Sequence, residues 1–290
     1  GPTREDLAVI ASLLGVALAA APILAPPPAA PPPLPPPPAI EEVFAIPPPL
    51  RQAVHGHVGT AGGRSDHQRL EALVRYLFDP QGLGIEYRHD ADHTVAEAWQ
   101  ARKANCLSFT ILTIALAREL GIEAYGQEIP RVLNWYREGD ILYFSNHVNA
   151  GAHIAGRRLS VDVAQDQVLA AAPPRQVDDR RLLAIFHSNR AATLLARGDH
   201  RLAAGYMDAA FAADDRYATA WSNAGVLAQR EGRQDEAERD FQRALELDPA
   251  HEGALMNLAG LHAARGEHER EARVRRRIER IQRHNPFHHF

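Results

Sequence analysis

The feature that most constrains the fold is a pattern of small and large residues with a 34-residue period in the last third of the chain. The clearest unit contains Trp221, Gly225, Ala228, Gly232, Ala237, Phe241, Ala244 and Pro249. The preceding unit contains Ala191, Leu194, Gly198, Ala203, Met207 and Ala210, with His187 and Asp215 in place of the Trp and the Pro. The following unit contains Leu255, Leu258, Ala259, His262 and Gly266. A fixed period of this length is typical of stacked supersecondary repeats.

These spacings resemble the tetratricopeptide repeat, whose unit is a helix-turn-helix. The resemblance predicts an all-α array of three units over residues 183–283. Small residues such as Gly225 and Ala237 would let paired helices approach each other, while Trp221 and Phe241 would fill the space between repeats. Arrays of this family bind proteins and catalyse nothing themselves, so the resemblance implies a protein partner.

The last helix of this array is strongly basic. It contains seven Arg and two Glu between Arg270 and Arg283. Two interpretations of this helix remain open, namely a solvated cap on the array and a docking surface for an acidic partner or lipid headgroups.

Composition limits what the rest of the chain can be. A length of 290 residues with 46% apolar and 23% charged residues is typical of a chain with a buried core and room for two domains. The formal net charge of −4 provides no global positive field for nucleic acid, so no nucleic-acid partner is expected. The single cysteine, Cys106, excludes intramolecular disulfides and four-thiolate zinc sites.

The N-terminal region consists of two biased segments. Leu7 to Ala25 is 19 residues without a charge, which predicts a signal peptide or membrane anchor over residues 1–25 and hence an exported, periplasmic or membrane-anchored protein of the cell envelope. The proline runs between Pro22 and Pro49 predict an extended spacer over residues 26–50, and a ligand for a proline-binding groove is the alternative. The folded part is expected to begin near residue 50.

Residues 51–175, between the spacer and the repeats, contain the candidate catalytic residues. Thr94 to Glu97 is a capping box that should start a short helix ending near Arg102. The run from Cys106 to Leu120 is apolar on nearly every face and is followed by Gly121, which predicts a buried central helix with Cys106 in its first turn. Unpaired amides and the helix dipole at that position favour the thiolate, the nucleophilic form of cysteine, although a lone cysteine on an apolar helix is more often a packing residue.

A β-hairpin is expected downstream of this helix. The segment from Ile141 to Val163 has the pattern of strands, with a turn at Ala155-Gly156. If Ile154 pairs with Arg157, Asn149 lies opposite Asp162 and His147 lies diagonally from Asp162 on one face, within side-chain reach. A histidine oriented by a carboxylate beside a nucleophile is the arrangement that acyl transfer requires.

Cys106 at the start of a buried helix, the strand His147-Val148-Asn149 and the segment Val161-Asp162-Val163 together resemble the transglutaminase-like superfamily, which shares the papain-type arrangement of catalytic groups. The resemblance covers roughly residues 65–165 and implies an α+β core in which the cysteine helix packs on antiparallel strands. It implies that Cys106 is the nucleophile, His147 the general base and acid, and Asp162 the residue that orients the imidazole. The aromatic residue that usually follows the histidine is absent, and Val163 replaces a proline.

Further site residues follow from the same resemblance. The backbone amide of Cys106 and the side chain of Gln100, six residues upstream, are candidate oxyanion donors, although Gln100 could equally be an exposed helix residue. His153 shares a strand face with His147 and is the alternative base. Two histidine groups, one from His89 to His93 and one formed by His284, His288 and His289, suggest a solvated loop and a frayed tail and not a metal site. No phosphate-binding glycine loop is present, so neither metal nor cofactor is expected.

The sequence thus predicts an exported cysteine-dependent acyl-transfer enzyme. Hydrolysis of a peptide or isopeptide bond is favoured over crosslinking to an amine, because an amine acceptor needs a binding groove of its own. The repeats would recruit a protein substrate or partner. The hypothesis from a different class is a catalytically silent adaptor in which the repeats act as a scaffold.

Overall fold

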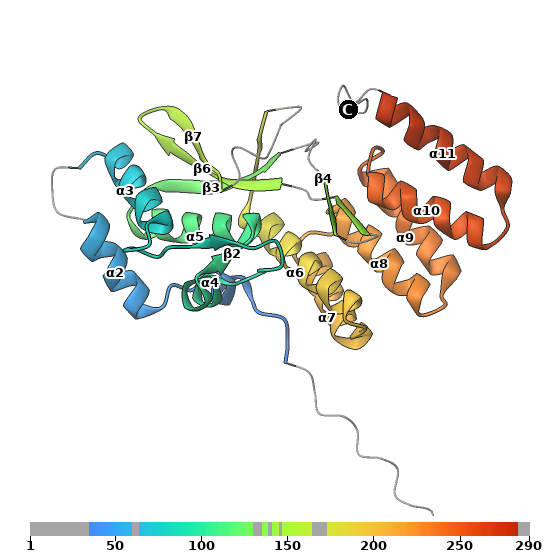
Figure 1. Ribbon diagram of the computed structural model, residues 1–290, viewed down its shortest axis with the longest axis horizontal. Helices are drawn as coiled ribbons and strands as arrows, with labels where there is room; N and C mark the ends of the chain where they lie inside the picture. Colours follow the sequence, from blue (N-terminus) through green and yellow to red (C-terminus); the bar gives the residue numbers. More distant parts are fainter. Residues whose placement is uncertain are drawn as a thin grey trace, which may run out of the picture. The chain divides into compact units, whose positions relative to one another are not determined.

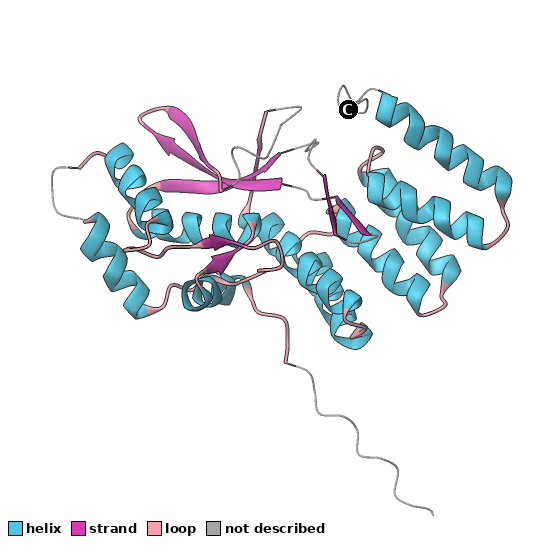
Figure 2. Cartoon of the chain, in the orientation of Figure 1, coloured by secondary structure: helices cyan, strands magenta, loops and turns pink. Residues whose placement is uncertain are grey.

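The computed structural model describes residues 35–59, 64–129, 135–138, 141–144, 147–163 and 173–283 (Figures 1 and 2). Contacts divide the chain into two units, Gly1–Pro35 and Pro36–Phe290. The predicted signal or anchor segment lies outside the described residues, and among the helices that are described none is long and apolar enough to span a bilayer. The helices are α1 (Ile40–Val43), α2 (Pro48–Val58), α3 (Asp66–Phe78), α4 (Val95–Ala101), α5 (Cys106–Glu119), α6 (Asp179–Ala196), α7 (His200–Ala213), α8 (Ala218–Arg230), α9 (Gln234–Leu247), α10 (Glu252–Ala264) and α11 (His268–Arg283). The strands are β1 (Glu86–Tyr87), β2 (Lys103–Ala104), β3 (Glu123–Ile129), β4 (Trp135–Glu138), β5 (Ile141–Phe144), β6 (His147–Ile154), β7 (Arg157–Val161) and β8 (Arg175–Val177).

The folded part begins earlier than the sequence predicts. The expectation of an extended spacer up to residue 50 is wrong from residue 40 onward, because α1 starts at Ile40 and α2 at Pro48. Proline is tolerated in the first turn of a helix, where the backbone N–H has no intrahelical acceptor. Val43 and Leu50 are fully buried in the main apolar cluster, so core packing and not composition decides this boundary.

The main sheet has the strand order β7-β6-β3-β8, and every neighbouring pair is antiparallel. The predicted hairpin register is confirmed, since Ile154 pairs with Arg157. The turn residues Ala155 and Gly156 have φ values of 50° and 75°. Two consecutive left-handed residues are typical of the tight turn that suits the right-handed twist of a β-hairpin.

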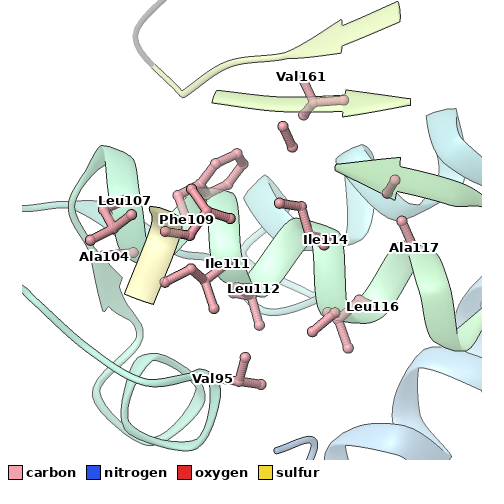
Figure 3. Packing of buried hydrophobic residues seen from close by; sticks show 14 of the residues in the cluster. Val95, Ala104, Leu107, Phe109, Ile111, Leu112, Ile114, Leu116, Ala117 and Val161 are labelled. Carbon is pink, nitrogen blue, oxygen red and sulfur yellow. The ribbon is translucent and has the colours of Figure 1, made fainter. Parts of the chain in front are cut away.

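Helix α5 is the centre of the α+β part. It contacts β6 and β3 on one side and α2, α3 and α4 elsewhere, and its residues from Cys106 to Ala117 are all buried. Figure 3 shows apolar side chains leaving α5 in different directions, with Leu112 toward Val95 of α4 and Ile114 toward the strand that carries Val161. A helix that is apolar all round must be covered on every side, which explains why the flanking helices and the sheet enclose it.

Helices α6 to α11 follow one another as helix pairs that match the predicted repeats. A Cβ at Gly225 would lie 2.5 Å from the ring of Phe241, so the glycine is what allows α8 and α9 to pack so closely. Trp221 packs against Phe211 of the preceding helix with ring centroids 4.4 Å apart. The expected roles of Gly225 and Trp221 are therefore confirmed, whereas the Phe241 ring packs on Gly225 within its own repeat.

The first helix pair of the array belongs to the core of the α+β part. One apolar cluster contains Leu182, Ile185 and Phe186 of α6 together with Leu112 and Leu116 of α5. A second cluster is formed by α8, α9 and α10, with side chains of α11 packed against it. The sequence predicts separate domains over residues 51–175 and 183–283, but the core is continuous across that boundary.

Candidate functional site

Cys106 is the first residue of α5 and lies at the surface of the core. Its residue exposure is 8%, and the preceding Asn105 caps the helix by accepting a hydrogen bond from the backbone N–H of Ser108 at 2.9 Å. The N–H groups of the first helical turn have no acceptor within the helix. The backbone amide of Cys106 is among them, so it is available to a developing negative charge beside the thiol.

His147 is the first residue of β6, and Asp162 directly follows β7. The β6–β7 register aligns Ala150 with Val161, which puts Asn149 opposite Asp162 and His147 one pair further along the same face. The Nε2 atom of His147 lies 2.7 Å from Oδ2 of Asp162, and both side chains are nearly fully buried. The Cys106 thiol also interacts electrostatically with the imidazole of His147. Because Nε2 faces the carboxylate, Nδ1 is the ring nitrogen available to the thiol.

The protonation of His147 reflects these neighbours. Burial alone would lower the pKa of the imidazole, but the hydrogen bond to Asp162 and the interactions with the Cys106 thiol and the Asp162 carboxylate outweigh burial and raise the pKa of His147 to about 9. An imidazole with a raised pKa stays protonated near neutral pH, where it can stabilise a thiolate and later donate a proton.

The sequence analysis placed Asn149 opposite Asp162 but gave it no role, and it missed Gln127 on the same sheet face. Asn149 donates from Nδ2 to Oδ2 of Asp162 at 3.1 Å, while its buried Oδ1 has no hydrogen-bond partner among the described residues. Gln127 of β3 is paired in register with Asn149, is buried, and accepts from the Ser160 hydroxyl at 2.9 Å. Both side chains lie on the sheet face opposite to Val148 and Ala150, which belong to the apolar cluster around α5. An amide at two cross-strand neighbours on that face was the signal that could have identified them.

A glycine makes room for these side chains. A Cβ at Gly151 would lie 2.4 Å from the ring of Tyr125 and 2.9 Å from Cδ of Gln127. Gly151 is therefore the position in β6 over which Gln127 of β3 crosses to reach Ser160 of β7.

The structure does not bring the two remaining candidates to the cysteine. Gln100 is exposed near the end of α4, and among the described residues it forms no hydrogen bond with Cys106 or His147. His153 lies opposite Arg158, close to the turn, as expected, but its Nδ1 is 3.1 Å from Glu123 Oε1 and its ring packs on Tyr125. The oxyanion role of Gln100 thus stays a prediction without a supporting contact.

The comparisons with known proteins concern parts of the chain. Residues 218–251 match the tetratricopeptide repeat family. A stretch of 89 residues is 37% identical to a probable biofilm formation methyltransferase, WspC, of Pseudomonas aeruginosa, and it covers 31% of this chain and 21% of that protein. The chain thus spans about a fifth of the length of this curated relative. The tetratricopeptide repeat at residues 218–251 indicates that the C-terminal helices interact with a protein partner.

Proposed function

We propose that the protein is a cysteine-dependent acyl-transfer enzyme of the transglutaminase-like type, in which the repeats recruit a protein substrate or partner. The observation that carries the proposal is the 2.7 Å contact between His147 Nε2 and Asp162 Oδ2, with the Cys106 thiol interacting electrostatically with the same imidazole. Nucleophile, base and orienting carboxylate therefore follow one another in the order that thiol-dependent acyl transfer requires.

In the proposed reaction, the Cys106 thiolate attacks the carbonyl carbon of an amide, and the carbonyl oxygen becomes an oxyanion. The backbone amide of Cys106 is positioned to donate to that oxyanion. Protonated His147 then transfers its proton to the leaving amine as the C–N bond breaks, which leaves a thioester on Cys106. Neutral His147 next removes a proton from water, whose oxygen attacks the thioester, and the carboxylic acid and the thiol are released. Asp162 keeps the imidazole oriented throughout.

Hydrolysis of a peptide or isopeptide bond is the favoured outcome, and transfer to an amine to give a crosslink is the variant reaction. Water is present wherever a site is not sealed, whereas an amine acceptor needs its own binding groove. The proposed location is the cell envelope, on the basis of the uncharged segment from Leu7 to Ala25.

The test is the pH dependence of iodoacetamide alkylation followed by intact mass. The chain has one cysteine, so every thiol adduct reports on Cys106. An activated thiolate reacts rapidly near pH 6, and His147→Ala should abolish that reactivity while the matched His153→Ala keeps it. Labelling that follows an ordinary thiol, with a midpoint near ~8.5 in wild type, would refute the proposal.

A second function is favoured by the match at residues 218–251, namely a catalytically silent adaptor that assembles proteins through its repeats. The two functions differ in how they depend on the thiol. In a cellular complementation test, an adaptor tolerates Cys106→Ser, whereas an enzyme does not. Phe241→Ala removes the buried ring from the repeat at residues 218–251 and should impair the enzyme function and the adaptor function alike.

A further inference from the structure

A partly buried polar cluster connects the start of α5 to the repeat array. Asn105, the residue that caps α5, donates from Nδ2 to Oδ1 of Asp92 at 2.6 Å while its own Oδ1 holds the N–H of Ser108. The Ser108 hydroxyl donates to the carbonyl of Ala91 at 2.8 Å and accepts from the N–H of His93 at 2.6 Å. The loop around Asp92 was predicted to be solvated, but it is bonded directly to the first turn of the cysteine helix.

Helix α6 holds the other side of the same loop. Asn189 donates from Nδ2 to Oδ1 of Asp92 at 3.1 Å, so one carboxylate oxygen receives an amide from α5's cap and another from α6. Arg190 donates to the backbone carbonyl of Asp92 at 2.9 and 3.1 Å and forms an ion pair with Glu97 of α4. The sequence separations of 97 and 98 residues mean that these bonds form only in the folded chain.

The same helix is fixed at the far end of α5. Arg118, in the last turn of α5, forms a two-pronged ion pair with Asp179 at the start of α6, with distances of 2.6 and 2.9 Å. The start of α6 therefore lies by the end of α5, and the region of Asn189 lies by its beginning. Together with the shared apolar cluster, these bonds hold α6 along α5 as a single packed unit.

The carboxyl group of Asp92 is largely shielded from solvent and accepts hydrogen bonds from two side-chain amides. Burial raises the pKa of its carboxyl, and the hydrogen bonds from Asn105 and Asn189 and the charge of Arg190 only partly counter burial. Hydrogen bonds from amides to a largely buried carboxylate are short and directional, because few waters compete for the oxygen.

We propose that Asp92 is a positioning residue for Cys106, and that Asn189 of the repeat array completes the bond network that fixes the cap of the nucleophile helix. Asp92 acts through Asn105, whose place sets the first turn of α5 and therefore the thiol relative to His147. Helix α6 then helps to position the active site, in addition to being part of the array that binds a protein partner. This inference rests on the proposed function of Cys106.

The experiment uses the full chain and measures the iodoacetamide rate at pH 6 relative to pH 9, with thermal melting of each variant as a fold check. Wild type should show a high ratio. Asp92→Ala removes the shared acceptor and should lower the ratio by about tenfold, the size expected for loss of a hydrogen bond to a charged group. Asp92→Asn keeps an oxygen that accepts from Asn105 and should retain most of the ratio. A merely structural role would change both rates together and leave the ratio constant.

Asn189→Ala decides the question if Asp92→Ala does not fold. This change leaves the bond from Asn105 to Asp92 in place and should lower the ratio by a smaller factor, while the matched Asn257→Ala in α10 should keep the wild-type ratio. The inference is overturned if Asp92→Ala or Asn189→Ala keeps the wild-type ratio while His147→Ala loses it. A wild-type chain that itself labels as an ordinary thiol overturns the proposed function instead, so the two failures are distinguishable.

Discussion

The folded protein should lose stability between about pH 6.5 and pH 9, because His147 holds its proton more tightly in the folded state than in the unfolded chain. Its hydrogen bond with Asp162 and its interaction with the Cys106 thiol raise the pKa from 6.5 to about 9. A group whose pKa is raised on folding contributes stability that is complete below the unfolded value and is lost as the pH rises through the folded value. Since each pH unit between the two values corresponds to roughly 1.4 kcal/mol, the upper limit of this contribution is about 3 kcal/mol.

Urea denaturation of wild type and His147→Gln isolates this contribution. The free energy of unfolding of wild type should exceed that of the variant most at about pH 6, and the difference should shrink by about 2 to 3 kcal/mol at about pH 9.5. Repeating the pair in a Cys106→Ala background removes the thiol's own titration. Part of the pH dependence should remain there, because the bond to Asp162 persists. A difference that is constant across this pH range would mean that His147 does not titrate as a bonded, buried imidazole, and the reasoning would be wrong.

Three further outcomes are expected. Phe241→Ala should lower the free energy of unfolding in urea by about 3 to 5 kcal/mol because the ring is fully buried, and the half-exposed Phe78 provides a control that should cost less. Gly225→Ala should destabilise by about 1 to 3 kcal/mol, since its Cβ would lie 2.5 Å from the Phe241 ring, and an unchanged melting temperature would contradict the packing described for α8 and α9. Glu123→Gln weakens only the ion pair with His153 and should leave the pH dependence of Cys106 alkylation unchanged. An altered pH dependence would mean that His153, the alternative base, acts on Cys106.

Local pattern was enough to predict much of the fold. The capping box at Thr94, the buried helix that starts at Cys106 and the hairpin register at Ile154 and Arg157 are all present in the structure. Each depends on residues close together in the chain, where helix caps, apolar runs and turn residues act directly on the backbone. The start of the fold at Ile40 was not predictable in this way, because the proline-rich composition gives no sign that Val43 and Leu50 find partners in a distant core.

The site was predictable to the same extent and for the same reason. The two-residue side-chain period of a hairpin puts His147 near Asp162 once the turn is known, so that contact follows from local sequence. Asp92 and Asn189 are 97 residues apart, and no spacing rule brings them together. Their contact depends on how α6 packs against α5, which is a property of the whole core.

The energetics of burial bear on the choice between enzyme and adaptor. Placing an imidazole and a carboxylate in a nearly dry site carries a desolvation penalty, and replacing such a pair by apolar residues of similar volume is often neutral or stabilising. The 2.7 Å pair of His147 and Asp162 is therefore not explained by a contribution to stability alone. A protein that only binds partners through its repeats does not require such a pair beside a thiol. The same reasoning applies to Asp92, a largely buried carboxylate at the cap of the cysteine helix. The concentration of Asn105, Asp92, His147 and Asp162 around one helix terminus favours a role for that terminus in chemistry.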